Sequence, residues 1–520
     1  MDQRVEKKKH SLKERYAAMT GDLHWETTYQ SMDEVFPYEQ YEGIRIHQWD
    51  KFEDPFRLTM DAYWKLQGEK EKKLYAVIDA FAQNSGQFGV SDARYVNALK
   101  LFIQSFTQQT YYAHRSFAHL GRHFRGDALR VACQMQSADE LRHFQNQTHA
   151  IANFNKYFNG LHNATHWFDH AWYLAAPKSF SEDAFSAGPF ERLIAISFSF
   201  DYLLTKPLFV STMSGAAHNG DLSSVTVGFS AQSDEARHMT LGLECVKFIV
   251  GQDPANLPIV QRWMDKWFWR GYRVMTLAAM MQDYMQPKRT TSWKQAWEMY
   301  VESTGEALFK ELAQVGIRQP KGWAQACDGK DHISHQAWNA FYGYGDTTAF
   351  HTWVPEPSEL DWLSKKYPDS FDRWYRPRLE HYAQLQKSGQ RYTNKTLPML
   401  CQTCQLPMFF TEPSGPRWIA YRETQHAGER FHFCSDHCEE IFSNEPEKYS
   451  QAGLPVHQIL QGHCFKPEVN AAAPGFDPAS AVLDYCQINQ GYDNGEFKGS
   501  EDDTNFASWG GGQNPQEAQL

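Results

Sequence analysis

The sequence lacks the features of a membrane, secreted or nucleic-acid-binding protein. No run of about 18 consecutive apolar residues occurs in the 520-residue chain, so we expect no membrane span. Residues 1–16 are charged and have no apolar stretch, unlike a secretory signal. The net charge of −11 argues against a nucleic-acid-binding surface, which would be basic. These absences predict a cytoplasmic protein with neither a membrane nor a nucleic acid as partner.

Cysteine is too scarce for a disulfide scaffold, with only 9 in the chain. Four of them form the close pairs Cys401-x-x-Cys404 and Cys434-x-x-x-Cys438. Four thiolates in two pairs suit tetrahedral Zn²⁺ and leave no open coordination position, so we predict a structural zinc site rather than a catalytic one. The alternative is four buried free thiols. The remaining cysteines show no pairing by spacing and are expected to be core or surface thiols: Cys133, Cys245, Cys327, Cys464 and Cys486.

A pentapeptide that occurs twice is the strongest positive feature. Residues 139–143 read D-E-L-R-H and residues 234–238 read D-E-A-R-H, each inside a long stretch that favours helix. A spacing of three places the Glu and the His on one helix face. Two such helices facing each other form the core of a carboxylate-bridged dimetal site in a helical bundle. The candidate metal ligands are therefore Glu140, His143, Glu235 and His238; two other Glu-x-x-His pairs, Glu423/His426 and Glu429/His432, lie in strand-like sequence near the clustered cysteines and are not expected to be dimetal ligands.

The pattern along the chain predicts a mainly α protein. It would contain a ferritin-like four-helix dimetal bundle inside a larger helical domain, plus a small C-terminal zinc-binding α+β module. Apolar periodicity predicts helices over residues 57–82, 91–123, 128–158, 190–213 and 223–250. The expected organisation is an extended N-terminal arm (1–60), a helical domain (61–388, with the metal-bearing helices in 91–250), a four-cysteine zinc module with a docking segment (389–490) and a flexible tail (491–520).

A bundle site of this type also takes one carboxylate from each of its other two helices. Asp201 lies in the otherwise apolar stretch I-S-F-S-F-D-Y-L-L-T, where a charge would be costly unless it were bound or paired. We therefore predict that Asp201 is a ligand. Thr205, four residues later, shares its face, and its hydroxyl could either enter the pocket or bond back to its own helix.

The first helix of the bundle has no acid to offer. Between Leu101 and Phe124 there is neither an Asp nor a Glu, so one terminal carboxylate is missing. Thr110, His114 or water could fill the space. A lone His on such a face can equally be a pocket or packing residue.

The Asp and Arg of each pentapeptide are predicted to support the ligands. A metal-bound His usually donates its other N–H to a carboxylate, and Asp139 and Asp234 could accept across the bundle. Arg142 and Arg237 could neutralise these aspartates. The alternative is a surface ion pair between residues three apart on a helix.

Several longer stretches resemble a known family. They include E-D-P-F-R-L-T-M-D (53–61), F-S-A-Q-S-D-E-A-R-H-M-T, W-F-W-R-G-Y-R and L-P-V-H-Q-I. With the doubled pentapeptide, they resemble the large (alpha) subunit of bacterial multicomponent phenol hydroxylases, within the soluble diiron monooxygenases. The resemblance extends from about residue 10 to 495, and the Cys-rich segment is similar to the YHS-type zinc module of these subunits.

The resemblance implies that the Glu and His of each pentapeptide serve one iron, with the glutamates able to bridge the two. It places Asp201 and Thr110 where the family has terminal glutamates, and Thr205 at the family's active-site threonine. Two of six ligands are thus altered. Asp201 is one methylene shorter than Glu and can still ligate, whereas Thr110 removes a charge and a strong ligand.

The implied function is O₂-dependent hydroxylation of a phenol or related small aromatic. The chain would be the oxygenase component, with two Fe and one structural Zn. The expected partners are beta and gamma hydroxylase subunits, a small coupling protein and an FAD/iron–sulfur reductase. Two alternatives remain: a paralogue whose first iron is weak or absent through Thr110 and which performs different oxidative chemistry, or a non-catalytic scaffold subunit.

Overall fold

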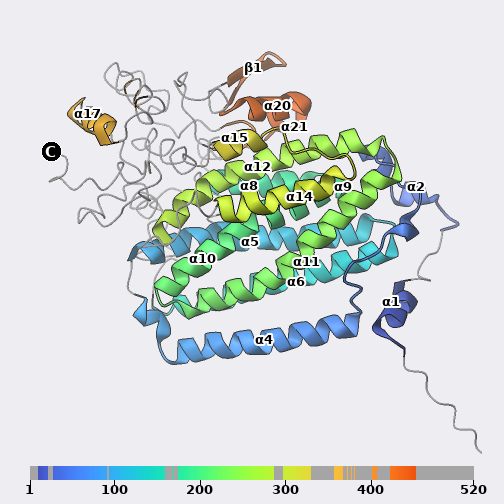
Figure 1. Cartoon of the computed structure of the whole chain (residues 1–520), viewed down its shortest axis with the longest axis horizontal. Coiled ribbons are helices and arrows are strands. Elements are labelled where there is room, and N and C mark those ends of the chain that lie inside the picture. Colours follow the sequence, from blue (N-terminus) through green and yellow to red (C-terminus); the bar gives the residue numbers. More distant parts are fainter. Residues whose placement is uncertain are drawn as a thin grey trace, which may run out of the picture.

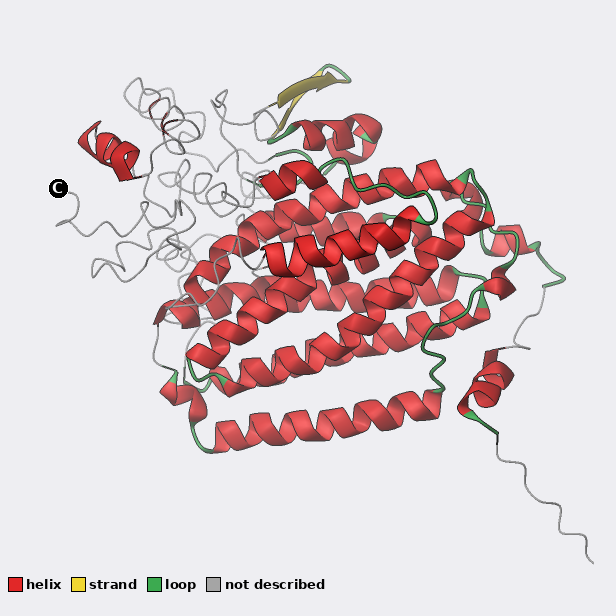
Figure 2. Cartoon of the chain, viewed as in Figure 1, coloured by secondary structure: helices red, strands yellow, loops and turns green. Residues whose placement is uncertain are grey.

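The computed structural model is mainly helical (Figures 1 and 2). It describes residues 10–20, 27–90, 93–157, 168, 174–285, 297–328, 357–366, 372, 376, 380, 401–406 and 422–452. The predicted tail (491–520), Cys464 and Cys486 lie outside the described residues, as do parts of the predicted helical domain and module. The predicted fold class is confirmed: a helical body carries a small α+β module at one side.

Four long helical runs form the bundle (Figure 1). The predicted bounds agree with the structure to within a few residues. The runs are α5 (Ala93–His123), α6 (Asp127–Phe154), the continuous run from Pro189 to His218, and α11 (Leu222–Gln252). α11 keeps Gly242 in its interior because a neighbouring helix approaches closely: a Cβ there would lie 2.2 Å from the Ser197 Cβ.

The Pro189–His218 run is the most apolar part of the core. It consists of α9 (Pro189–Leu193), a π-helix η4 (Ile194–Thr205) and α10 (Lys206–His218). Its start is capped from a distant segment, since the Glu42 carboxylate accepts hydrogen bonds from the backbone N–H groups of Phe190 (3.1 Å) and Glu191 (2.8 Å). Among the described helices it alone is long and apolar enough to cross a membrane, yet 94% of its most apolar window is buried inside the protein, as in a core helix.

Helix α4 (Met60–Gln83) flanks the bundle against α6 and α11 (Figure 1). Its C-terminal half packs through Leu74 and Ile78 against Ala150 and Val227. Its N-terminal half presents polar side chains to the bundle instead. Gly68 lies on the solvent-exposed side of this half, where a Cβ would meet no atom within 4 Å.

The N-terminal arm is less extended than predicted. Its described part contains the short helices α1 (Leu12–Thr20), α2 (Met32–Val35) and α3 (Tyr38–Glu42) and a 3₁₀ turn η1 (Trp49–Lys51). A further turn η2 (Gly86–Gly89) leads toward α5. α1 is held by Tyr16, whose hydroxyl donates to Asp54 Oδ2 at 3.2 Å.

Further helices cover the bundle, and the module sits on them (Figure 1). The covering elements are α8 (Ala175–Ser186), α12 (Asn256–Met285), η5 (Glu298–Glu302), α14 (Ser303–Ala313) and α15 (Trp323–Asp328), whereas α17 (Pro357–Lys366) lies apart from the bundle helices in Figure 1. The module has an antiparallel hairpin, β1 (Arg422–His426) paired with β2 (Glu429–Phe433), followed by α20 (Asp436–Asn444) and α21 (Pro446–Ser450). The hairpin turn places Ala427 and Gly428 in the left-handed region, at φ 50° and 84°.

Candidate metal centres

The bundle brings the candidate ligands together at its centre. Glu140 on α6, Asp201 on η4, and Glu235 and His238 on α11 are all buried, and each offers a ligand atom within 4.8 Å of the others. His143 Nδ1 lies 3.6 Å from a Glu140 oxygen and 3.4 Å from a Glu235 oxygen. Five donors from three helical runs therefore face one point.

These donors have the chemistry of a metal site. Both oxygens of Glu140 and both of Asp201 are buried and accept no hydrogen bond. Burial raises the pKa of Asp201 well above its usual value, and the nearby Glu235 adds to this effect. Carboxylates that are buried without donors are costly unless a cation compensates them. Two imidazoles and three carboxylates therefore fit a dimetal group of the carboxylate-bridged kind.

Each histidine is held by the aspartate of the opposite pentapeptide. His143 Nε2 on α6 lies 3.2 Å from Asp234 Oδ2 on α11, and His238 Nε2 on α11 lies 3.3 Å from Asp139 Oδ2 on α6. In both cases Nδ1 faces the cluster of carboxylates. Nε2–H donation to an aspartate leaves Nδ1 free to bind a metal.

The two arginines complete this crossed arrangement. Arg142 Nη1 lies 3.1 Å from Asp139 Oδ1 and 3.3 Å from Asp234 Oδ2, while its Nη2 lies 2.6 Å from Glu71 Oε1. Arg237 pairs with Asp139. Asp139 and Asp234 are buried, so the alternative of exposed surface pairs does not hold.

Helix α4 supplies partners that the sequence reasoning missed. The Tyr63 hydroxyl donates to Asp139 Oδ1 at 2.8 Å, and Lys70 Nζ donates to Asp234 Oδ2 at 2.8 Å. Gln67 Nε2 donates to both aspartates, at 2.9 Å each. A signal was present in the sequence, since polar residues four and three positions apart share the face of α4 that should be apolar.

Helix α5 contributes no carboxylate to the cluster of donors. This helix contains no Asp or Glu, and the buried Thr110 hydroxyl donates to the Phe106 carbonyl of its own helix at 2.9 Å. Gln147 Nε2 approaches the same hydroxyl at 3.4 Å. His114 Nδ1 donates to the Ser137 carbonyl at 2.8 Å, so His114 takes the packing alternative and is not among the converging donors.

Thr205 ends the π-helix one turn beyond Asp201. Its buried hydroxyl donates to the Phe200 carbonyl at 2.9 Å, a bond to the residue five positions back. Aromatic rings line the neighbouring space: Phe106 stacks on Phe200 with centroids 6.1 Å apart and meets Phe209 edge-on at 5.2 Å. These rings therefore pack α5 against the helical run that carries Asp201 and Thr205.

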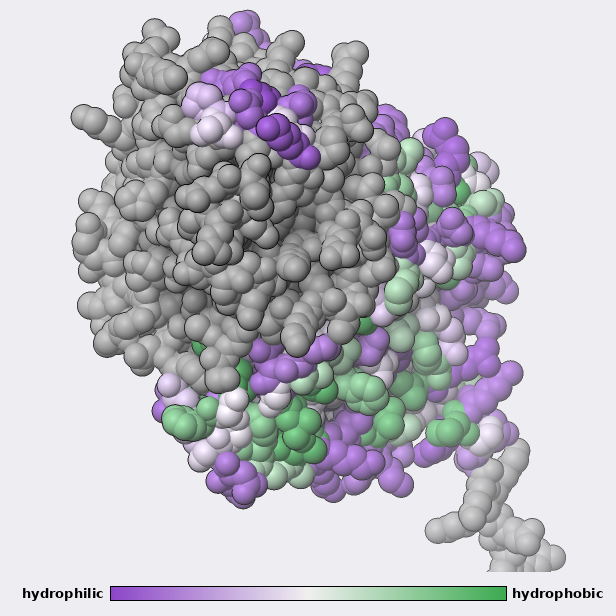
Figure 3. All heavy atoms as spheres, turned by 60° about the vertical axis from the view of Figure 1, so that its left-hand side comes forward, coloured by the Kyte–Doolittle hydropathy of each residue, from purple (hydrophilic) through white to green (hydrophobic). Residues whose placement is uncertain are grey.

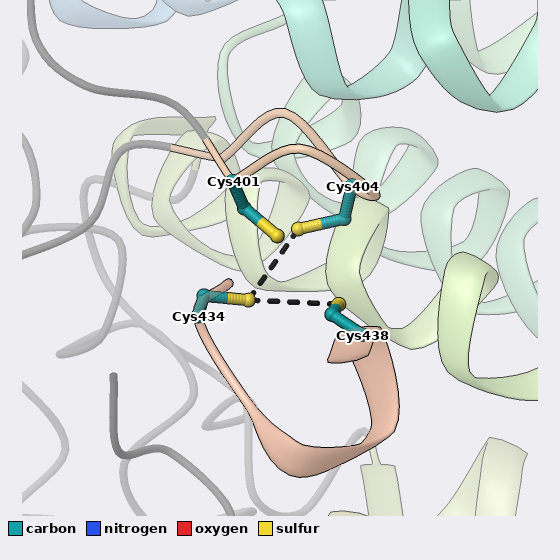
Figure 4. Close-up of side chains that lie close together, drawn as sticks. All are labelled: Cys401, Cys404, Cys434 and Cys438. Carbon is teal, nitrogen blue, oxygen red and sulfur yellow. Dashed lines mark hydrogen bonds between the residues drawn. The ribbon is translucent and has the colours of Figure 1, made fainter. Parts of the chain in front are cut away.

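The four clustered cysteines converge at a second site (Figure 4). Cys401 and Cys404 lie on one loop, Cys434 follows β2, and Cys438 lies in the first turn of α20; all four sulfurs lie within 4.8 Å of one another. Cys434 Sγ lies 3.5 Å from Cys404 Sγ and 3.7 Å from Cys438 Sγ. Burial raises the pKa of Cys404, but hydrogen bonds from the other three thiols and the charge of Arg273 outweigh it and hold the pKa well below its usual value. The set fits a tetrahedral tetrathiolate metal ion.

A buried ionic cluster fastens the module to the bundle. Arg270 on α12 donates from Nη1 to the Thr403 carbonyl at 2.6 Å, and its Nε lies 3.2 Å from Asp183 Oδ2 on α8. The Tyr449 hydroxyl of the module also donates to Asp183 Oδ2, at 2.7 Å. Lys266 and Lys448 contact the other oxygen of the same carboxylate. Asp183 is therefore the common partner of the module and α12.

Comparisons with known proteins agree with this architecture. The family described as Methane/Phenol/Alkene Hydroxylase matches residues 25–253, and the YHS domain matches residues 412–452. The YHS match contains Cys434 and Cys438 but begins after Cys401 and Cys404.

Relatives match over most of their length. The oxygenase component DmpN of phenol 2-monooxygenase from Pseudomonas sp. (strain CF600) is 57% identical over 95% of this chain and 94% of that protein. The alpha subunit of the oxygenase component of the alkene monooxygenase system from Xanthobacter autotrophicus is 26% identical over 85% and 89%. A crystal structure of xenon-pressurized phenol hydroxylase from Pseudomonas sp. OX1 superposes with a TM-score of 0.77 at 55% identity, covering 96% of this chain and 99% of that one. The chain therefore belongs to the methane/phenol/alkene hydroxylase family, as an oxygenase component related to that of phenol 2-monooxygenase.

Proposed function

We propose that the chain catalyses the O₂-dependent hydroxylation of phenol or a related small aromatic, as the oxygenase component of a multicomponent monooxygenase. The supporting observation is the convergence of five buried donors, with each histidine held by the aspartate of the opposite helix. The high identity to a phenol 2-monooxygenase component supports the choice of substrate.

The proposed cofactors are two irons in the bundle and one zinc in the module. Glu140 and His143 would hold one iron, Glu235 and His238 the other, and Asp201 would be a terminal ligand. When reduced iron is bound, it supplies the activation of O₂ and the transfer of one oxygen atom to the ring. The four module cysteines would hold zinc with no position left for substrate.

The chain's own residues orient the ligands and keep the site dry. Asp139 and Asp234 hold the Nε2 protons of the histidines, so that Nδ1 stays directed to the metals. Phe106, Phe200 and Phe209 form an apolar wall that excludes water and accepts an aromatic ring. We propose that Thr205 provides a hydroxyl at the edge of this wall.

Two cavities adjoin the elements that carry the ligands. A small cavity of about 40 Å³ is lined by Gln147, Phe209 and Thr212, on the side of Thr110. A larger one of about 290 Å³ is lined mainly by apolar side chains of η4, α11, α12 and α14, including Tyr202 and Met239. The apolar lining of the larger cavity favours a small apolar ligand over a charged one.

The proposed location is the cytoplasm. The proposed partners are beta and gamma hydroxylase subunits, a small coupling protein and an FAD/iron–sulfur reductase, because the relatives are components of multicomponent systems. Hydrophobic side chains gather in patches on the helical face in Figure 3. Large exposed apolar residues include Trp64, 53% exposed, and Phe229, 73% exposed. Such surfaces are typical of subunit contacts.

One observation favours a second candidate function. Thr110 supplies no carboxylate and turns its hydroxyl to its own helix. A first iron held by fewer ligands would bind more weakly, so we keep as the alternative a changed metal site with different oxidative chemistry. A non-catalytic scaffold subunit is less favoured, because the structure buries four converging donors, with His143 beside them, that would be costly to bury without metal.

The direct test is phenol-dependent O₂ consumption by the assembled hydroxylase with its reductase and coupling protein. We expect wild-type activity, and a loss of at least about 100-fold in Glu140→Gln, because removal of a ligand charge weakens metal binding and transition-state stabilisation together. Glu244→Gln, the same change on the partly exposed face of α11, is the matched control and should retain activity. Iron-loaded wild-type protein that consumes no O₂ with phenol would contradict the proposal.

A further inference from the structure

Helix α4 lies outside the four-helix bundle, yet its inner face reaches both halves of the metal centre. Tyr63, Gln67, Lys70 and Glu71 occupy this face at spacings of four, three and one. Of the two aspartates, Tyr63 donates a hydrogen bond only to Asp139, and Lys70 donates only to Asp234.

Gln67 is the one residue of this face that contacts both aspartates. Its Nε2 donates to Asp139 Oδ1 and to Asp234 Oδ1, at 2.9 Å each. The side chain is 1% exposed, and its Oε1 has no hydrogen-bond partner. Two carboxylates can accept only from the NH₂ end of the amide, so its orientation is fixed by the aspartates.

The aspartates in turn fix the two imidazoles. Asp139 Oδ2 contacts His238 and Asp234 Oδ2 contacts His143, so each carboxylate uses one oxygen for Gln67 and the other for a histidine. A rotation of either carboxylate would break both of its contacts. Gln67 Nε2 therefore links the positions of the two histidines, alongside Arg142 and Arg237, which also contact both aspartates.

This part of α4 is docked by polar contacts rather than by an apolar seam. Leu74 and Ile78, which pack against α6 and α11, lie in the following turns. The interactions that place residues 63–71 on the bundle are thus largely those that organise the metal centre.

We propose that Gln67 is a positioning residue of the metal centre, which holds Asp139 and Asp234 in register and thereby sets the orientation of both histidines. The proposal rests on the assignment of a dimetal site to the bundle. It deepens that assignment by naming a residue on a fifth helix that neither touches the metals nor belongs to the doubled motif.

The test uses the assembled hydroxylase loaded with ⁵⁷Fe, examined by Mössbauer spectroscopy and by the rate of iron extraction with a chelator. Gln67→Met keeps the size of the side chain and removes both donated bonds. We expect it to change the spectra of both irons and to speed extraction about 10-fold, the lower end of the effect of losing such partners.

Two further variants test the two aspartates separately. Tyr63→Phe removes a contact of Asp139 only and should alter mainly the iron beside His238, whereas Lys70→Met should alter mainly the iron beside His143. Lys72→Met, an exposed change on the same helix, is the matched control and should leave both spectra and the extraction rate unchanged. If Gln67→Met does not yield folded protein, Gln67→Leu also removes the donor without adding a charge beside the two aspartates, and the same result is expected.

The inference is overturned if folded Gln67 variants leave the spectra and the extraction rate at wild-type values, or change one iron alone. A lower melting temperature with unchanged spectra would mean that Gln67 only stabilises the fold, and would also overturn it. Neither measurement requires turnover, so an inactive enzyme would count against the proposed reaction and not against this role. A wild-type spectrum with a single iron would count against the two-iron assignment, while the extraction rate would still test Gln67.

Discussion

The two candidate metal centres are built in opposite ways. In the bundle, each ligand is placed by the middle of a long helix, and neighbouring helices supply the second partner of each histidine. In the module, one loop presents Cys401 and Cys404, and the start of α20 presents Cys434 and Cys438, where the N-cap Ser435 side chain accepts from the Cys438 N–H at 3.2 Å. The cysteine site is therefore organised locally, whereas the bundle site depends on the packing of at least four helical elements.

Their charges are also balanced differently. The bundle site gathers carboxylates, and its surrounding aspartates are neutralised by Arg142, Arg237 and Lys70. The module gathers thiols, with Arg273 beside them, and is fastened through Asp183 to Lys266 and Arg270. This difference predicts that the two metals can be removed one at a time.

The largest expected effect is the loss of the module's metal in Cys404→Ser. Structural zinc contributes about 10–16 kcal/mol to the folding of small zinc domains, and loss of one thiolate removes most of that binding. We expect zinc content near zero with iron content retained, measured by elemental analysis. Cys327→Ser, outside the cluster, should keep both metals. Unchanged zinc in Cys404→Ser would show that the four sulfurs are not the site.

Asp183→Asn should weaken the ionic contacts that hold the module against α8 and α12. It leaves Lys266, Arg270 and Lys448 near a neutral amide in a buried place, which typically costs about 3–5 kcal/mol in the free energy of unfolding. Asp61→Asn, an exposed aspartate on α4, should change it little. A destabilisation of less than about 1 kcal/mol would contradict the role of Asp183, because that is the size of an exposed ion pair.

The pH dependence of this effect has a definite sign. Burial raises the pKa of Asp183, but the charges of Lys266, Lys448 and Arg270 outweigh it and hold the pKa below the usual 3.8. Its contribution to stability is therefore complete above about pH 4 and is lost as the pH falls through the folded-state pKa. In unfolding experiments, the difference in the free energy of unfolding between wild type and Asp183→Asn should become smaller below about pH 4. A difference that becomes larger in acid would contradict a lowered pKa of Asp183.

Thr110→Glu should strengthen the binding of the first iron, for which Thr110 supplies no carboxylate. A carboxylate on α5 would supply the missing charge and ligand, so we expect higher iron occupancy and several-fold higher phenol-dependent O₂ consumption. Thr110→Gln has the same size without the charge and should produce neither. If Thr110→Glu behaves like Thr110→Gln, the side chain at this position does not reach the metals.

The smallest effect is expected from Thr205→Val. The variant loses one hydrogen bond to the Phe200 carbonyl, worth about 1 kcal/mol, and we expect less than about 10-fold lower turnover. Thr205→Ser keeps the hydroxyl and should restore activity. A Ser variant as impaired as the Val variant would mean that the methyl group, not the hydroxyl, matters here.

The sequence predicted the parts of both centres that depend on local spacing. The Glu-x-x-His step puts both ligands on one helix face, and the cysteine spacing alone indicates a tetrathiolate site. The absence of an acid on α5 was equally visible, and the structure describes no substitute carboxylate from that helix.

What the sequence did not predict depends on contacts between distant segments. The contact of Gln67 with Asp234 joins residues 167 positions apart, and nothing local to either one indicates it. The π-helix that carries Asp201 and Thr205 lies in a stretch whose apolar residues surround the whole helix, so its periodicity does not reveal the wider turn. The predicted extended arm contains short helices, and two contacts that spacing does not reveal hold it: Tyr16 with Asp54 within the arm, and Glu42 with the start of α9.

Metal counting on the purified hydroxylase tests the central claim most directly. We predict about two irons and one zinc per chain by elemental analysis, with iron lost in Glu140→Gln and zinc lost in Cys404→Ser. About one iron would favour the changed metal site. Zinc alone, with no iron bound after reconstitution, would contradict the assignment of the bundle as an iron-dependent oxygenase centre.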